Sequence, residues 1–182
     1  MTRGTASEET SRLEIQENAD EQQSFVAFYE AEFAQMVKIA YVLSGSRLAA
    51  EDLAQEAMLA THRRWEMVRT LDRPEAWTRR VVVNKATSQY RRRRAEIRAI
   101  ARLGPLRGSP PAPVAVEFAH VWDEVRNLPR RQQQAIVLFY VDDLSVADIA
   151  EVMDCSANTV KVHLHKARQT LAGKLDVDEA PS

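Results

Sequence analysis

The segment 145-SVADIAEVMDCSANTVKVHLHKARQTL-171 predicts the fold of the C-terminal part of the chain. Ser145, followed three residues later by Asp148, forms a capping box that starts a helix. The run from Asp154 to Ser156 interrupts that helix, and Ser156 can cap a second one. Two short helices joined by a tight turn are typical of a helix-turn-helix, in which the first helix braces the second and the second enters the major groove of DNA.

The second of these helices is predicted to have two different faces. With 100° per residue, the apolar Leu164, Ala167 and Leu171 fall within about 40° of Val160 and form one stripe. The far side and its flanks carry side chains suited to base edges and phosphates, namely Asn158, Lys161, Val162, His165, Lys166, Arg168 and Gln169. The spacing also allows an ordinary helical hairpin with a solvated outer face, so both interpretations stay open.

Positive charge is concentrated in the middle of the chain. Residues 62–107 carry 14 basic and 4 acidic side chains, a net charge of +10, within a chain whose net charge is −1. Residues 1–61 carry −7 and residues 108–182 carry −4. This segregation favours a polyanionic partner, although an arginine-rich helix face that is merely solvated is the alternative.

Three helices are predicted before the proline-rich region. Apolar side chains recur at three- and four-residue steps from Phe25 to Tyr41, and the run from Ser44 to Ser46 ends that helix. A second helix is predicted from Arg47 to Trp65, with acidic side chains near its start. A third is predicted from about Arg73 to the four arginines at 91–94, because flanking residues at helical spacing outweigh the short valine run within it.

Composition and punctuation predict an all-α chain of two small helical domains. The 182 residues are 45% apolar, which is enough for two small cores, and glycines and prolines are scarce outside residues 104–113. We expect an acidic, mobile tail over 1–20, a first domain over 21–98, a flexible Pro/Gly-rich linker over 99–116, a second domain over 117–175 and a tail over 176–182.

Several classes of protein are disfavoured by what the sequence lacks. A single cysteine, Cys155, excludes an intramolecular disulfide, and His163 and His165 lie about 200° apart on their helix, so they do not converge on a metal ion. No secretion signal and no apolar run of membrane-spanning length is present, which predicts a cytoplasmic protein. No phosphate-cradling glycine loop or nucleophile with a base is visible, so we expect neither an enzyme nor a bound cofactor.

Three segments resemble the extracytoplasmic-function group of the sigma-70 factors. The stretch AEDLAQEA at 50–57 is similar to the helix by which that group binds polymerase. Residues 74–94, which begin PEAW and end in the arginine run, resemble its promoter-melting helix, and residues 128–168 resemble its C-terminal promoter-reading domain. The order of the three segments, with a proline-rich linker before the last, makes the resemblance specific.

The resemblance implies a sigma-2-like helical bundle and a sigma-4-like helix-turn-helix domain. It implies a sigma factor that binds the beta and beta-prime subunits of core RNA polymerase, directs the polymerase to promoter DNA and helps to open it, with an anti-sigma protein as a further partner. Five residues would bind the core polymerase: Glu51, Asp52, Leu53, Gln55 and Glu56. An exposed acidic helix with no partner is the alternative for that segment.

The resemblance also implies two sets of DNA-binding residues. The minus-ten set is Trp77, Arg80, Asn84, Lys85, Arg91, Arg92, Arg93 and Arg94, with Arg79 as a further phosphate ligand and the loop 67–72 as a specificity loop. The minus-thirty-five set is Asn158, Thr159, Lys161, Val162, His165, Lys166 and Arg168. Core packing remains an alternative for Trp77, as does an ordinary surface amide for Asn84.

Four positions depart from the pattern of the group. Met58 replaces a common aromatic residue, Asp143 and Asp154 occupy turn positions where glycine is frequent, and Gln133 replaces an arginine and so puts a phosphate contact there in doubt. The main rival is a stand-alone helix-turn-helix regulator that does not bind polymerase. That interpretation explains the C-terminal domain but gives no role to the basic and acidic helices of the first domain.

Overall fold

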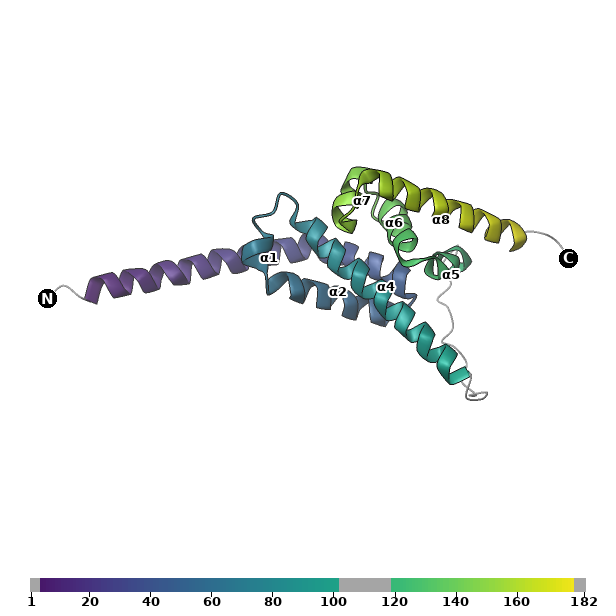
Figure 1. Cartoon of the computed structure of the whole chain (residues 1–182). Coiled ribbons are helices and arrows are strands. Elements are labelled where there is room, and N and C mark those ends of the chain that lie inside the picture. The colour runs from purple at the N-terminus through teal and green to yellow at the C-terminus, as the bar shows by residue number, and fades with distance from the viewer. Residues whose placement is uncertain (1–3, 102–118, 179–182) are drawn as a thin grey trace.

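The computed structural model describes residues 4–101 and 119–178, and every regular element in these two ranges is a helix. The first range contains α1 (Gly4–Ser44), α2 (Arg47–His62), α3 (Trp65–Val68) and α4 (Pro74–Ala101). The second contains α5 (Ala119–Asn127), α6 (Arg130–Tyr140), α7 (Val146–Met153) and α8 (Ala157–Asp178). The all-α prediction is confirmed, and Figure 1 shows the two helical groups in contact.

The first helix is longer than the apolar pattern predicts. The sequence indicated a helix from Phe25, preceded by a tail, whereas α1 begins at Gly4. Its N-terminal part extends away from the other helices (Figure 1). Glu, Gln and Ala favour helix without needing an apolar stripe, so apolar periodicity does not detect a helical segment of that composition.

A tight turn joins α1 to α2, as the sequence predicts. Gly45 has φ +71°, and Ser46 caps α2 by accepting a hydrogen bond at its Oγ from the Ala49 amide at 3.4 Å. A Cβ atom at Gly45 would lie 3.2 Å from the guanidinium of Arg126. Glycine therefore meets both the left-handed backbone and the close approach of the second domain.

The short helix α3 is attached to α1 by aromatic packing. The ring of Trp65 lies 5.3 Å from that of Phe25 and 5.0 Å from that of Phe28. Its indole Nε1 donates a hydrogen bond to Ser24 at 2.8 Å. The predicted second helix thus ends at His62, and Trp65 begins a separate turn.

Helix α4 is continuous through the valine run, and Val82 and Val83 are buried. It continues past the arginines to Ala101, which is inside the region predicted as linker. Residues 102–116 of that predicted linker lie outside the described residues, as do 179–182 of the predicted C-terminal tail.

The second domain follows the sequence prediction closely. Helix α6 spans Arg130 to Tyr140, and the predicted Ser145–Asp148 capping box starts α7. The two turn aspartates, Asp143 and Asp154, have φ of 52° and 54°. Asp is among the few residues that tolerate this left-handed conformation, so these turns form without glycine.

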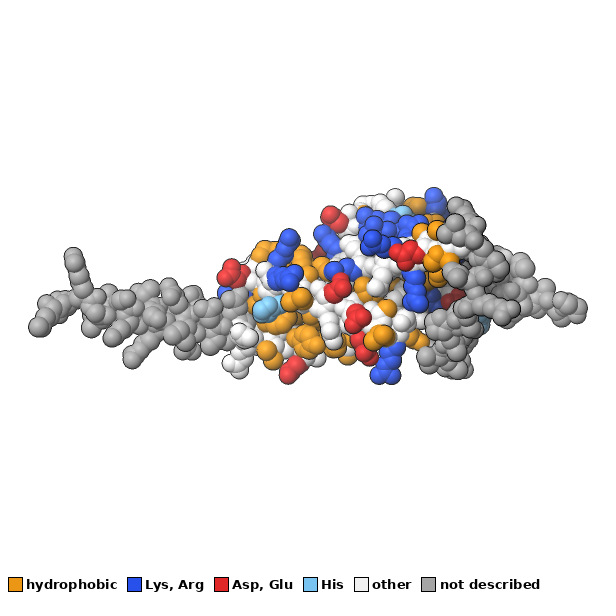
Figure 2. Space-filling model, turned by 90° about the horizontal axis from the view of Figure 1, so that it is seen from below, with side chains coloured by type: hydrophobic (Ala, Val, Ile, Leu, Met, Phe, Trp, Pro, Cys, Tyr) orange, Lys and Arg blue, Asp and Glu red, His pale blue; other side chains and the backbone are white. Residues whose placement is uncertain are grey.

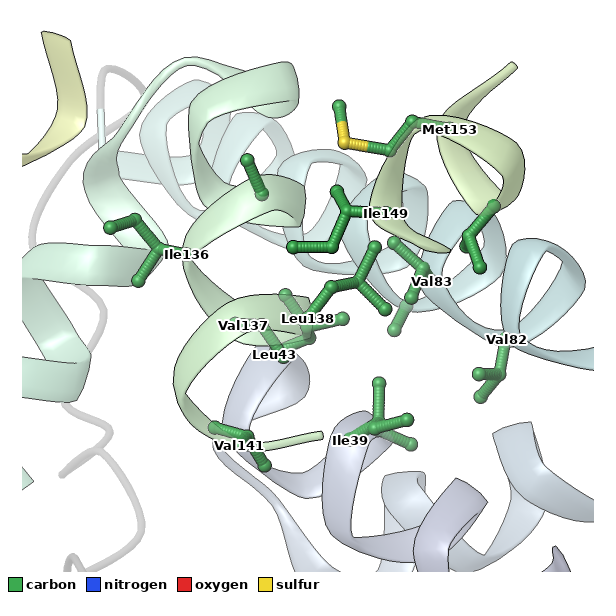
Figure 3. Close-up of a cluster of buried hydrophobic side chains, with 14 of the residues drawn as sticks. Ile39, Leu43, Val82, Val83, Ile136, Val137, Leu138, Val141, Ile149 and Met153 are labelled. Atoms are coloured by element: carbon green, nitrogen blue, oxygen red, sulfur yellow. The ribbon is translucent and has the colours of Figure 1, made fainter. Parts of the chain in front are cut away.

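Buried apolar side chains of the two domains form one continuous core. Figure 3 shows Ile39 and Leu43 of α1 and Val82 and Val83 of α4 facing side chains of α6 and α7, including Leu138 and Ile149. In the part of the chain that the structure describes, no helix has the length and apolar character of a membrane span.

Candidate nucleic-acid interface

Helix α8 separates its side chains as the helical period predicts. Val160, Leu164 and Ala167 are buried, and Leu171 packs at the edge of the core. Six of the seven residues predicted to meet the minus-thirty-five element are exposed, namely Asn158, Lys161, Val162, His165, Lys166 and Arg168. The seventh, Thr159, is half-buried and shares a hydroxyl hydrogen bond of 2.8 Å with Ser156.

The turn between α7 and α8 fixes the second helix by short-range hydrogen bonds. The Cys155 amide donates to the Ala150 carbonyl at 3.0 Å. Ser156 caps α8 by accepting from the Thr159 amide at 3.1 Å. Together they set the angle at which α8 leaves α7.

The exposed face of α8 has one cation that is already held in place. Arg168 donates to the Tyr140 hydroxyl at 3.0 Å, and its guanidinium lies 5.2 Å from the centre of the Phe139 ring. Packing of this kind orients a guanidinium without neutralising it. Within the part of the chain that the structure describes, Lys161 and Lys166 form no ion pair, so their exposed ammonium groups are available to an anion.

Asn84 lies where α4 meets the second domain. Its Oδ1 accepts hydrogen bonds from Arg130 Nη2 at 2.6 Å and from Gln134 Nε2 at 3.0 Å. A cavity of about 180 Å³ beside it is walled by both domains, through Arg80, Asn84, Arg130, Arg131 and Gln134 among others. Trp77, two turns earlier on the same helix, is half-buried and is not part of the continuous core.

The predicted phosphate-binding cations fall into two groups. Arg91, Arg92 and Arg93 are exposed on the free part of α4. Arg80 donates to the carbonyls of Val152 at 3.0 Å and Glu151 at 2.6 Å, and Arg94 contacts Asn127. Lys85 pairs with Glu56 of α2 at 2.7 Å. On the face of the molecule shown in Figure 2, Lys and Arg side chains gather most densely at the upper right of the coloured surface, with acidic side chains beside them.

Arg79 was predicted as a phosphate ligand, but the structure buries it. The residue is 9% exposed, its Nε donates to Asp142 at 2.6 Å, and its Nη1 lies 3.1 Å from Glu32. One guanidinium thus joins a carboxylate of its own domain to one of the second domain. A guanidinium that is itself buried and paired with two carboxylates is not available to DNA in this conformation.

Burial and neighbouring charge change the acidity of the groups at this contact. Desolvation raises the pKa of Glu32, and Glu75 and Asp142 act in the same direction against the opposing effect of Arg79. At the start of α7, hydrogen bonds from Ser145 and then from Arg73 lower the pKa of Asp148. The contact is therefore built on charges that depend on one another across the two domains.

The acidic face of α2 has the exposure that a binding surface needs. Asp52, Gln55 and Glu56 are exposed and Glu51 is partly so. Leu53, predicted as part of the same surface, is 3% exposed and belongs to the core. It holds α2 against its neighbours rather than offering a side chain to a partner.

The contacts between the domains were not predicted, among them those of Gln35, Arg130, Gln134 and Asp142. Their partners lie between 46 and 107 positions away in the chain, and no local pattern indicates contacts of that separation. Gln133, which replaces an arginine common in the group, is 1% exposed. It faces the core, so it has no access to phosphate.

Comparison with known proteins assigns both helical groups. The family model for sigma-70 region 2 matches residues 28–96, and the model for sigma-70 region 4 matches residues 121–171. The first match covers the basic and acidic helices for which a stand-alone helix-turn-helix regulator has no use. The comparison thus favours the sigma factor over that rival.

Relatives and solved structures agree with these matches. The chain is 30% identical over 127 residues to an RNA polymerase sigma-E factor of Streptomyces antibioticus, which covers 70% of this chain and 71% of that one. It is 29% identical over 140 residues to the sigma factor EcfG of Rhodopseudomonas palustris, covering 76% and 77%. The fold is similar to that of the sigma factor RpoE in complex with the anti-sigma factor NepR from Bartonella quintana, with a TM-score of 0.65, 22% identity and coverage of 86% and 99%.

A second solved structure, of CnrH in complex with the cytosolic domain of CnrY, gives a TM-score of 0.63 at 22% identity and covers 87% of this chain and 91% of that one. The two family models match the two helical groups in chain order, and the sequence identity to known sigma factors extends over most of the chain. The chain belongs to the extracytoplasmic-function group of the sigma-70 family, the sigma factors that bind core RNA polymerase and direct it to promoters.

Proposed function

We propose that three surfaces divide the work of this sigma factor: α2 for the core polymerase, α4 for the minus-ten element and α8 for the minus-thirty-five element. The observation that carries the proposal is the division of α8 into a buried apolar stripe and an exposed face of polar and cationic side chains. A helix held firmly on one side and polar on the other suits the major groove.

The proposed reading of the minus-thirty-five element uses the exposed face of α8. Asn158 and His165 offer hydrogen-bonding groups to base edges, and Val162 offers an apolar contact to a thymine methyl group. Lys161, Lys166 and Arg168 bind phosphates and hold the helix in register. We keep Thr159 in the proposed minus-thirty-five set because it lies in the first turn of α8.

The proposed role of α4 is to read and hold a separated strand. Extracting a base from its stack costs roughly a few kcal/mol, which stacking groups and phosphate contacts can offset. Asn84 is the proposed base reader, Trp77 the stacking group at the fork, and the loop 67–72 the wall of the base site. The proposed phosphate ligands are Arg80, Lys85, Arg91, Arg92, Arg93 and Arg94.

The proposed polymerase contact is the acidic face of α2. Its exposed side chains, Asp52, Gln55 and Glu56, with Glu51 beside them, would dock on the clamp helices of the beta-prime subunit. The second domain would contact the beta subunit. Acidic and hydrogen-bonding side chains on one helix face favour a basic partner surface, because opposite charges steer the two surfaces together.

We further propose an anti-sigma protein as partner and the cytoplasm as the place of action. A structurally similar relative is bound to an anti-sigma factor, which supports the first, and the polymerase works in the cytoplasm, which supports the second. We also propose that the chain has no catalytic activity of its own. Co-purification from cells without any inhibitory protein would count against the anti-sigma partner.

The proposed reader role predicts a base-specific defect. Asn84→Ala removes the amide that would pair with the unstacked base, so transcription should fall on promoters with the preferred base and little on promoters with another base there. The measurement is in vitro transcription with sigma-free core polymerase on promoters that vary at each minus-ten position. An equal loss on every promoter would refute the reader role.

A second substitution on α4 tests the proposed phosphate contacts. Arg92→Ala removes an exposed cation whose described ion pair is a weak one with Glu96 at 3.9 Å. Promoter binding by the holoenzyme should weaken on all sequences, and the slope of its logarithmic salt dependence should fall by about one. A defect limited to one promoter sequence would contradict this role.

A further inference from the structure

A tyrosine of α6 lies beside the exposed face of α8. Tyr140 is the last residue of α6 and is 56% exposed. Its hydroxyl accepts a hydrogen bond from Arg168 Nε at 3.0 Å, which joins the two helices at the surface. An aromatic side chain with this exposure contributes little to the core, so packing alone does not account for a tyrosine at this position.

Two aromatic rings hold the guanidinium of Arg168 in one orientation. Its central carbon, Cζ, lies 5.2 Å from the centre of the Phe139 ring and 5.6 Å from that of the Tyr140 ring. Both distances are within the range of cation–π contacts. The two rings meet edge to face at 5.0 Å, and Phe139 packs against the buried core. The core therefore fixes Phe139, and Phe139 in turn positions Tyr140 and Arg168.

The hydrogen bond between Arg168 and Tyr140 leaves donors free on both side chains. A guanidinium has five N–H donors, and this bond uses only the one on Nε. Among the described residues, none forms an ion pair with Arg168 or accepts a hydrogen bond from its two terminal nitrogens. A phenol oxygen that accepts a hydrogen bond keeps its own O–H to donate. Tyr140 and Arg168 thus present a neutral and a cationic donor side by side.

This pair of donors suits a phosphate group. A phosphate offers several acceptor oxygens, so a hydroxyl and a guanidinium can bind the same group at once. Both side chains are among the usual ligands of DNA phosphates. The C-terminal end of α6 is the negative end of its helix dipole and repels an anion, so the charge of Arg168 is needed there. The Tyr140 hydroxyl should therefore bind phosphate only while Arg168 is present.

Arg168 lies late in α8 and on the flank of its exposed face. It is 11 residues beyond Ala157, the first residue of α8, which is about 16 Å along the helix axis. Around the axis it lies about 80° from Val160 of the buried stripe. In a helix-turn-helix, the N-terminal residues of the second helix contact the bases. A side chain this far from the first turn is therefore placed for the DNA backbone at the edge of the groove.

We infer that Tyr140 is a further DNA-binding residue, which forms with Arg168 a clamp on one phosphate beside the minus-thirty-five element. Arg168 supplies the charge, the Tyr140 hydroxyl supplies a second hydrogen bond, and Phe139 positions both. A phosphate contact carries no direct sequence information, so the clamp sets the register of α8 on the duplex and not the choice of bases. This inference rests on the proposed role of α8.

The test removes one hydroxyl from the full-length chain. Tyr140→Phe keeps the ring and its cation–π contact, but it loses both the acceptor for Arg168 and the donor for phosphate. Tyr29→Phe is the matched control, because it removes the same atom from α1, where the ring stacks on Phe33 at 4.7 Å. Each protein is assembled with sigma-free core polymerase and titrated against a duplex promoter that the wild-type holoenzyme selects from a library. The titration is repeated on duplexes in which each phosphate in and around the minus-thirty-five element is replaced, in turn, by a neutral methylphosphonate.

The expected loss of affinity maps to one phosphate. On the native duplex, Tyr140→Phe should bind about tenfold more weakly than wild type, as for the loss of a hydrogen bond to a charged group, whereas Tyr29→Phe should match wild type. At one methylphosphonate position, wild type should lose affinity and Tyr140→Phe should lose markedly less. Arg168→Ala should lower the slope of the logarithmic salt dependence by about one, and adding Tyr140→Phe to it should have no further effect. The preferred bases of the minus-thirty-five element should be the same in all of these proteins.

Two results would overturn the inference. The first is a Tyr140→Phe protein that binds as tightly as Tyr29→Phe, and the second is a Tyr140→Phe protein that is as sensitive as wild type to every methylphosphonate. Failure of the proposed function gives a different result, because Lys161→Ala would then also leave duplex affinity unchanged. If Lys161→Ala weakens binding and Tyr140→Phe does not, only the phosphate clamp fails.

Discussion

His163 lies on α8 with its ring partly buried and with Arg131 and Lys166 nearby. Burial lowers the pKa of His163 below its usual value of 6.5, and the two cations act in the same direction. The folded chain therefore binds this proton less tightly than the unfolded chain does. The resulting stability is fully present above pH 6.5 and is lost as the pH falls through the lowered pKa.

This residue predicts a specific pH dependence. The free energy of unfolding of wild type should fall between pH 7.5 and 5.5, and part of that fall should be missing in His163→Gln, which cannot be protonated. Urea unfolding at both pH values measures the difference. An equal fall in both proteins would show that protonation of His163 does not destabilise the folded chain.

Local signals at single residues were predicted well from the sequence. Ser145 and Asp148 are three residues apart, so their reciprocal hydrogen bonds depend on that helix end alone. Asp154 takes the left-handed backbone that its turn position requires. The covering of Asn84 by Arg130 could not be predicted, because it depends on how two separate domains meet.

At the scale of elements, helix α8 is anchored by a buried apolar stripe and presents the second domain's part of the candidate site on its exposed face. Leu164 is 3% exposed in that stripe, whereas Val162, two residues earlier, is 42% exposed. The same helix thus offers a core position and a surface position of similar chemistry. This contrast allows the packing of α8 to be tested without changing its charge.

Truncation of the buried position should destabilise the domain. Leu164→Ala removes buried apolar contacts and should cost about 2–5 kcal/mol of unfolding free energy. Val162→Ala should change it by roughly 0.5 kcal/mol or less, since a surface side chain loses little packing. Chemical denaturation monitored by circular dichroism measures both. Similar losses for the two variants would contradict the assigned faces of α8.

Elements were predictable where an apolar stripe defined them. The inward face of α8 was predicted, because Val160, Leu164 and Ala167 recur at helical spacing and all three are buried. The start of α1 was not, because residues 4–20 carry few apolar side chains and pattern recognition depends on them. Leu53 was assigned to the polymerase-binding surface by the family resemblance alone, and the structure shows that it packs inward.

At the scale of the whole molecule, the sequence predicted two domains and the sites on each, but not how they contact one another. A net charge of +10 over residues 62–107 indicated a polyanionic partner. In the structure, acidic side chains and helix carbonyls of the second domain partly satisfy that charge, through Asp142, Asp148 and the end of α7. Complementary charge between the two domains therefore helps to hold them in contact.

The proposed division of the chain into polymerase-binding and promoter-reading surfaces is tested by initiation from a promoter library, with sigma-free core RNA polymerase, the purified full-length chain and no inhibitor present. Transcripts should begin at a fixed distance downstream of a shared two-part promoter element, and polymerase alone should give none from such promoters. Failure of the chain to direct initiation, or start sites without a common upstream element, would contradict it.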